Sequence, residues 1–138
     1  SAVSSQRILG RDPSTGRGIA IATEGGLIKA IDFLEHGEKQ WLSAGFIDLQ
    51  VNGYAGHDLN GLTLDVATVQ ALCQAMLKVG VTTFLPTLIT APEARLIAAL
   101  RTIREACAQH PDVAAMVAGV HVEGPHIAPE DGPRGAHP

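Results

Sequence analysis

The chain has 138 residues, 46% of them hydrophobic and 17% charged, a composition typical of a soluble globular protein rather than a disordered or fibrous one. The formal net charge is −4 and the 10 lysines and arginines are scattered, so the sequence has no basic stripe for a nucleic-acid backbone. No apolar run approaches the ~18 residues that cross a bilayer, and no signal-peptide pattern is visible. We therefore expect a protein that binds neither nucleic acid nor membranes. Its first residue, Ser1, suggests that N-terminal residues are missing.

Two cysteines, Cys73 and Cys107, lie in segments that the sequence predicts to be helical, and neither has a partner at metal-ligand spacing. Cysteines of this kind are typical of proteins in reducing compartments, where the thiol packs as a small apolar group. We therefore expect two reduced, buried thiols in a cytoplasmic protein.

The first part of the chain predicts a small antiparallel sheet. In residues 18–34, GIAIATEGGLIKAIDFL, two β-rich runs are separated by Glu24, Gly25 and Gly26, a pattern typical of a hairpin with a tight glycine turn. The character of the sequence changes after the polar stretch that follows. We expect residues 1–44 to form one unit and residues 45–138 another.

The second part predicts strands that alternate with helices. Strands are expected at 45–51 and 82–90 and within 114–124, and helices at 65–79 and 92–110. This alternation is typical of parallel βαβ units with right-handed crossovers. Three such units cannot close a (β/α)₈ barrel, which needs about 250 residues, so on a barrel interpretation the chain is only its first part. A three-stranded open sheet is the alternative.

Polar and apolar side chains alternate in residues 47–53, IDLQVNG. Because alternate side chains of a strand share a face, Asp48, Gln50 and Asn52 point one way and the apolar residues between them point the other. Burying polar groups without partners costs ~1–3 kcal/mol each, so this face must line a wet or ionic site or form a hydrogen-bonded network. Asn52 lies nearest the carboxyl end of the strand, where the active sites of barrel enzymes lie.

The segment GVHVEGPHIAPEDGPRGAHP, residues 119–138, places Glu123 at the carboxyl end of the third strand. A carboxylate there, followed by a loop with further histidines, is a candidate metal ligand, and a salt-bridged structural glutamate is the alternative. His121 is one step deeper and is expected to pack or to support a ligand. The sequence leaves the role of His126 open. The histidines outside this segment are expected to be solvated: His36, His57 and His110.

Three motifs, GFIDLQVNGYAG, TTFLPTLIT and HVEGPHIAP followed by GAHP, together resemble the N-acetylglucosamine-6-phosphate deacetylases of the amidohydrolase superfamily. The order and spacing of the motifs make the resemblance specific, and it covers essentially the whole chain. It implies an α/β fold: a (β/α)₈ TIM-type barrel, with its first three β/α units in residues 45–138, preceded in residues 1–44 by the N-terminal part of a small β-sandwich. It also implies a homodimer that converts N-acetylglucosamine 6-phosphate to glucosamine 6-phosphate and acetate.

The same resemblance implies roles for five residues. Glu123 matches the metal-binding glutamate of the E-G-P motif, and the metal is expected to be one divalent ion, Zn²⁺ or alternatively Fe²⁺. Most of the superfamily has a His-x-His pair where this chain has Gln50 and Asn52. Carboxamides are weak ligands beside imidazole, so a mononuclear site is implied, with the two amides lining the substrate pocket. Ala136 would contact the sugar through its backbone, and His137 would hydrogen-bond the acetyl carbonyl and stabilise the oxyanion.

The family's two other metal ligands, its acid/base aspartate and its phosphate contacts are expected after Pro138. Catalytic zinc sites generally use three protein ligands and a water, so we expect the 138 residues alone to be inactive. Two alternatives stay open. One is another amidohydrolase, acting on a different amide or amino-sugar phosphate, although such enzymes usually keep the first-strand histidine pair. The other is a non-catalytic βαβ module with a structural polar cluster.

Overall fold

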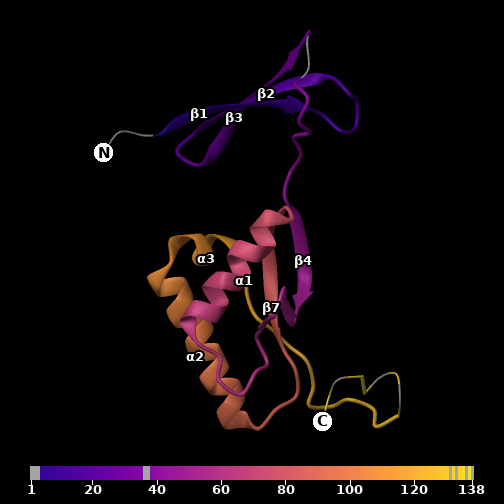
Figure 1. The fold of residues 1–138 in the computed structure, drawn as a ribbon, viewed down its shortest axis with the longest axis vertical. Coiled ribbons are helices and arrows are strands. Elements are labelled where there is room, and N and C mark those ends of the chain that lie inside the picture. The colour runs from indigo at the N-terminus through magenta and orange to yellow at the C-terminus, as the bar shows by residue number, and fades with distance from the viewer. Residues whose placement is uncertain (1–3, 36–37, 131, 133, 136, 138) are drawn as a thin grey trace. The chain divides into compact units, whose positions relative to one another are not determined.

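The computed structural model describes residues 4–35, 38–130, 132, 134, 135 and 137. The chain divides into two compact units, Ser1–Ala44 and Gly45–Pro138. Figure 1 shows strands in the first unit and both strands and helices in the second, so the chain is a mixed α/β protein, as the sequence predicts. Among the described residues, no helix is both long enough and apolar enough to span a membrane.

The first unit is an antiparallel sheet of β1 (Ser5–Arg11), β2 (Gly18–Glu24) and β3 (Leu27–Leu34), in that order. The predicted hairpin of β2 and β3 is confirmed. Its turn residues Gly25 and Gly26 have φ of 59° and 78°, a left-handed conformation that glycine adopts without steric cost and that suits the strand twist. The sequence did not indicate β1, because the apolar residues in SQRILGR are adjacent rather than alternating.

The sheet of the first unit leaves apolar side chains uncovered. On the central strand, Ile19 and Ala20 are buried. On β3, in contrast, more than half of the surface of four large side chains is exposed: Leu27, Ile28, Ile31 and Phe33. A second sheet packed on this one would remove such side chains from water. The β-sandwich implied by the resemblance stays a prediction.

The second unit contains a parallel sheet with the order β4-β7-β8. Its strands are β4 (Phe46–Val51), β7 (Val81–Leu88) and the two-residue β8 (His121–Val122). A short antiparallel ribbon of β5 (Gly53–Tyr54) and β6 (His57–Asp58) follows β4.

Helices connect these parallel strands. Between β4 and β7 runs α1 (Val66–Lys78), and α2 (Glu93–Gln109) follows β7. Figure 1 shows both helices on the same side of the strands. The predicted helices at 65–79 and 92–110 are therefore confirmed, as are the strands predicted at 45–51 and 82–90. Asp65 caps α1 by accepting a hydrogen bond from the Thr68 backbone N–H at 2.7 Å, and its hydrogen bonds with Thr68 hold the pKa of this carboxyl below its ordinary value.

The third strand is shorter than the sequence predicts. Within the predicted segment 114–124, only His121–Val122 is a strand, and Val117 makes a single bridge to Phe84. The residues before it belong to a third helix, α3 (Pro111–Met116). Proline suits the first position of a helix, and the buried Val113 and Met116 are three apart, as on one helical face. The predicted third strand is therefore present only as His121–Val122, because residues 114–116 at the start of the predicted segment complete the helix.

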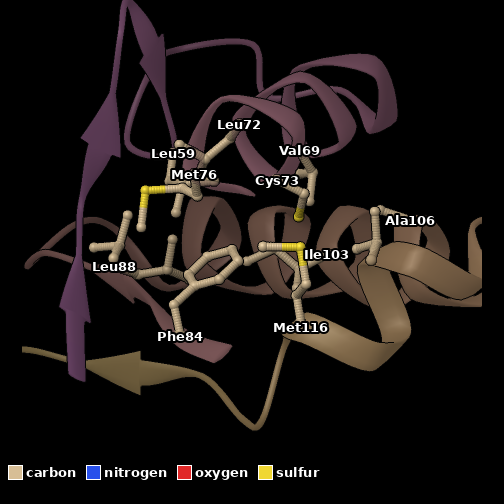
Figure 2. Packing of buried hydrophobic residues seen from close by; sticks show 12 residues of the cluster. Leu59, Val69, Leu72, Cys73, Met76, Phe84, Leu88, Ile103, Ala106 and Met116 are labelled. Atoms are coloured by element: carbon tan, nitrogen blue, oxygen red, sulfur yellow. The ribbon is translucent and has the colours of Figure 1, made fainter. Parts of the chain in front are cut away.

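The core of the second unit lies between the parallel sheet and its helices. Figure 2 shows the ring of Phe84, from β7, at the centre of this cluster. The one buried polar side chain in the described part of the chain is Thr87, whose hydroxyl donates to the Leu85 carbonyl and accepts from the Val51 N–H. The hydrophobic cluster consists of Val51, Leu59, Val69, Leu72, Cys73, Met76, Phe84, Leu88, Ile103, Ala106, Val113 and Met116.

The two cysteines are free thiols, but only Cys73 is fully buried, and Cys107 is half-buried. Burial, assisted by the nearby Asp112 and Cys107, raises the pKa of Cys73 from 9.0 to about 12, and burial also raises the pKa of Cys107. Because the thiolate is the reactive form, both thiols are held in their unreactive state near neutral pH. The prediction of buried thiols is thus confirmed for Cys73 and only partly for Cys107.

We expect iodoacetamide to modify Cys107 faster than Cys73 in the folded protein at about pH 8, with Cys73 reacting once urea unfolds the chain. Since the folded-state pKa of Cys73 lies above 9.0, the stability that this thiol contributes is present below pH 9 and declines as the pH rises toward 12. Mass spectrometry of the two alkylated peptides over time measures both rates. Equal rates in the folded protein would contradict the burial of Cys73.

Candidate active site

The carboxyl ends of β4, β7 and β8 lie at one edge of the sheet, because the three strands are parallel neighbours. Glu123 directly follows β8, and its backbone N–H donates to the Leu88 carbonyl at 2.9 Å. This bond continues the ladder one residue beyond the strand. The backbone of Glu123 is therefore fixed at the edge where the three strands end.

Three of the predicted site residues come together at this edge. Gln50, on β4, donates a short hydrogen bond from Nε2 to Oε1 of Glu123, which is 73 residues away in sequence. On the other side of the carboxylate, Nε2 of His137 lies 3.6 Å from Oε2. The side chains of His137 and Glu123 are only 12% and 19% exposed. The site thus combines a largely shielded carboxylate and imidazole with the carboxamide of Gln50, which is exposed.

The other polar residues of the first parallel strand make different contacts. Asp48 accepts a hydrogen bond from the backbone N–H of Gln50 at 3.1 Å. Asn52, just past the end of β4, donates from Nδ2 to the Thr87 carbonyl at 3.4 Å. The Asn52 amide therefore connects β4 to β7, and its role in substrate binding stays a prediction. Ala136, the predicted sugar contact, lies outside the described residues.

Asn60 has a structural role that the sequence analysis missed. Its Nδ2 donates to the carbonyls of Thr87 and Asn52, at 3.0 and 3.4 Å, and its Oδ1 accepts from the Ile89 N–H at 2.9 Å. The Asn60 side chain thus hydrogen-bonds backbone groups at the carboxyl ends of both β4 and β7, where the hydrogen bonds between these two strands end. The available signal was an asparagine between Leu59 and Gly61 in the glycine-rich loop, although such residues are equally common in ordinary turns.

The remaining histidines are distributed around the second unit. His121 is the first residue of β8 and is half-buried. This position is compatible with the predicted packing or supporting role. His126 is exposed. His57 and His110 are half-buried, so the prediction that they are solvated was only partly right, and His36 lies outside the described residues.

A cavity of about 340 Å³ lies beside the candidate site but is not formed by it. The loop 59–64, the exit of β7 at 88–91 and the first turns of α2 line the cavity, and Glu123, Gln50 and His137 do not. Two of the lining residues are hydrogen-bonded to each other: the guanidinium of Arg95 donates to the Asn60 carbonyl at 3.0 Å. The three side chains that meet at Glu123 therefore lie outside the lining of this cavity.

The described residues offer only part of a metal site. Among them, no three His, Cys, Asp or Glu side chains are close enough together to hold a metal ion. Glu123 fits a single ligand of a divalent ion, because it is a shielded carboxylate at the strand edge with one oxygen held by an amide. A catalytic zinc site generally takes three protein ligands, so a metal here would need ligands from outside the described residues.

Polar side chains at the carboxyl ends of parallel strands, with helices connecting those strands, are typical of α/β enzymes. Comparison with known proteins narrows this class and confirms the resemblance drawn from the motifs, which is to N-acetylglucosamine-6-phosphate deacetylases. The chain is 42% identical over 96 residues to the N-acetylglucosamine-6-phosphate deacetylase of Haemophilus influenzae, covering 70% of this chain and 24% of that protein. It is 37% identical over 101 residues to the N-acetylgalactosamine-6-phosphate deacetylase of Escherichia coli O157:H7, covering 73% of this chain and 26% of that protein.

The fold gives the same result. The crystal structure of the N-acetylglucosamine-6-phosphate deacetylase from Pasteurella multocida matches with a TM-score of 0.66 and 33% identity, over 80% of this chain and 30% of that one. No family model matches the chain. The chain spans about a quarter of the length of the curated relatives it matches.

Proposed function

We propose that this chain is part of an enzyme that hydrolyses the N-acetyl amide of N-acetylglucosamine 6-phosphate to give glucosamine 6-phosphate and acetate. The observation that carries the proposal is the meeting of Gln50 and His137 at the carboxylate of Glu123. These three residues come from the motifs that resemble the deacetylases. The relatives supply the reaction, and the contacts give these side chains a common place in which to perform it.

His137 supports the chemistry by its position. Its Nε2 faces the carboxylate in a shielded site, where a donor to the acetyl carbonyl oxygen is worth more than in water. This oxygen gains negative charge when water adds to the carbonyl carbon, and a donor already in place stabilises that charge. The C–N bond then breaks, the acyl group leaves as acetate and the nitrogen takes up a proton to become the amine. The acid that supplies this proton would lie elsewhere in the complete polypeptide.

Glu123 would be one ligand of a divalent metal, with Zn²⁺ preferred and Fe²⁺ also suited to such a site. When bound, the metal would polarise the acetyl carbonyl and activate the attacking water. Gln50 would orient the carboxylate of Glu123, because its amide donates to Oε1 and so fixes the position of Oε2. An amide at this position favours a site with one metal, because it is a weak ligand beside imidazole.

The (β/α)₈ barrel is part of the same proposal. β4, β7 and β8 would be its first strands, and the missing neighbours would cover the large side chains that β4 leaves about two-thirds exposed: Phe46, Ile47 and Leu49. The small sheet of the first unit would be completed into a β-sandwich by other parts of the polypeptide. Both additions would remove exposed apolar surface and open strand edges, which are otherwise an aggregation hazard.

N-acetylgalactosamine 6-phosphate is a second candidate substrate. The observation that favours it is the 37% identity to the N-acetylgalactosamine-6-phosphate deacetylase of Escherichia coli O157:H7. The two sugars differ only in the configuration of one hydroxyl. An enzyme site that hydrogen-bonds this hydroxyl discriminates between the two sugars. When the other sugar binds, a polar group of the site is left without its hydrogen-bond partner.

Acetate release by the complete polypeptide tests the proposal. We expect acetate from N-acetylglucosamine 6-phosphate, much less from N-acetylglucosamine without the phosphate, and loss of the activity after chelation with recovery on adding Zn²⁺. Acetate release from N-acetylgalactosamine 6-phosphate, assayed in parallel, shows which of the two sugar phosphates the enzyme prefers. A folded, zinc-restored protein that releases acetate from neither sugar phosphate would rule the function out.

A further inference from the structure

Thr90, two residues past β7, contacts both His137 and Glu123. Its backbone N–H donates to Nδ1 of His137 at 3.3 Å, and its Oγ1 lies 3.0 Å from the same nitrogen. The hydroxyl is also 3.4 Å from the backbone carbonyl of Glu123. Thr90 is half-buried and far from both residues in sequence. Thr90 therefore connects the residue that follows β8, Glu123, to the imidazole of His137.

The neighbouring backbone leaves space for this hydroxyl. Gly124 directly follows Glu123 and has a φ of 81°, which side-chain-bearing residues rarely adopt. A Cβ on residue 124 would overlap Oγ1 of Thr90. The glycine thus serves two needs at once, the left-handed turn after β8 and the close approach of Thr90 to Glu123.

The contacts of Thr90 decide where the proton of a neutral His137 lies. A backbone N–H can only donate, so Nδ1, which faces the Thr90 N–H, must be the ring nitrogen with the free lone pair. The proton of the neutral ring is then on Nε2, the nitrogen that faces Glu123. The Thr90 hydroxyl has a single proton, which it can give either to the Glu123 carbonyl or to Nδ1. The backbone N–H of Thr90 therefore sets the tautomer, and the hydroxyl restricts the position of the ring.

We propose that Thr90 is a positioning residue for the deacetylation, because it holds His137 with Nδ1 as acceptor and the Nε2 proton directed at the acetyl carbonyl. This inference rests on the proposed function for its catalytic consequence. In this proposal Thr90 acts on the histidine and not on the substrate. It acts on the reaction through the tautomer and orientation of the imidazole, as residues behind metal and catalytic histidines generally do.

Two variants of the complete polypeptide test this role. Thr90→Val keeps the shape and the backbone N–H but removes the hydroxyl, and we expect kcat to fall about 10–100-fold with KM changed less than about threefold. Thr90→Ser restores a hydroxyl, and we expect its kcat to lie within about threefold of the wild-type value. Wild-type kcat in Thr90→Val, or a Thr90→Ser enzyme as slow as Thr90→Val, would overturn the proposal.

The tautomer is measured separately from activity. With ¹⁵N-labelled histidine, at a pH about two units above the ordinary histidine pKa of about 6.5, we expect the His137 signals of a protonated Nε2 and an unprotonated Nδ1. A His137→Ala protein assigns the signals. A protonated Nδ1 in the wild-type protein would overturn the inference even if the enzyme is active. Absence of acetate release would instead count against the proposed function, and the spectrum would still decide the role of Thr90.

Discussion

Replacing Glu123 with glutamine in the complete polypeptide is expected to reduce acetate release from N-acetylglucosamine 6-phosphate by more than about 100-fold. Loss of a residue behind a metal ligand typically costs 10–100-fold, and loss of the ligand's own charge should cost more. The substitution keeps the shape of the side chain, and the amide oxygen at position 123 can still accept from Nε2 of Gln50. The fold should therefore survive while the metal affinity is lost.

Glu105→Gln is the matched control, because Glu105 is an exposed carboxylate on α2 whose one side-chain hydrogen bond in the described structure is with Gln109, a turn away. We expect this variant to keep wild-type activity and metal content. Acetate release and bound zinc are measured for both variants, with circular dichroism as the check on folding. Wild-type activity in Glu123→Gln would remove the metal role of this residue.

Leu72→Ala is expected to lower the free energy of unfolding by about 2–5 kcal/mol. The side chain of Leu72 is fully buried on α1, within the cluster around Phe84 (Figure 2). Truncation removes its transfer free energy and leaves a cavity in a closely packed interior. Alanine is the better helix former, so a measured loss reflects packing rather than helix propensity.

Leu62→Ala makes the same chemical change at a loop residue that is 87% exposed, and we expect it to alter the free energy of unfolding by less than about 0.5 kcal/mol. Urea unfolding followed by circular dichroism gives both values. Similar losses for Leu62→Ala and Leu72→Ala would contradict the placement of the core between the parallel sheet and its helices.

The local parts of the fold could be predicted because their determinants lie within a few residues of one another. α1 has a capping residue, Asp65, at its start and buried residues at helical spacing along its length. The hairpin of β2 and β3 has two adjacent glycines where the turn needs positive φ. α3 was missed because a six-residue helix leaves little periodicity to detect.

Three residues that meet in the structure, Gln50, Glu123 and His137, were named from the sequence, but their contacts could not be predicted. Alternation within β4 grouped Gln50 with Asp48 and Asn52, yet only Gln50 bonds to Glu123, whereas Asn52 bonds to β7. Such differences depend on which strands are neighbours and on their register, and no local pattern specifies either. Thr90 and Asn60 were missed for the same reason, since their partners are distant in sequence: the His137 imidazole for Thr90 and the Thr87 carbonyl for Asn60.

The most direct test of the account is a crystal structure of the complete polypeptide with glucosamine 6-phosphate, with anomalous scattering recorded at the zinc edge. We predict one ion within about 2.0–2.2 Å of a Glu123 carboxylate oxygen, with the sugar nitrogen beside it and Nε2 of His137 facing the place of the acetyl group. An ion bound away from Glu123, or a sugar bound at the opposite end of the strands, would contradict it.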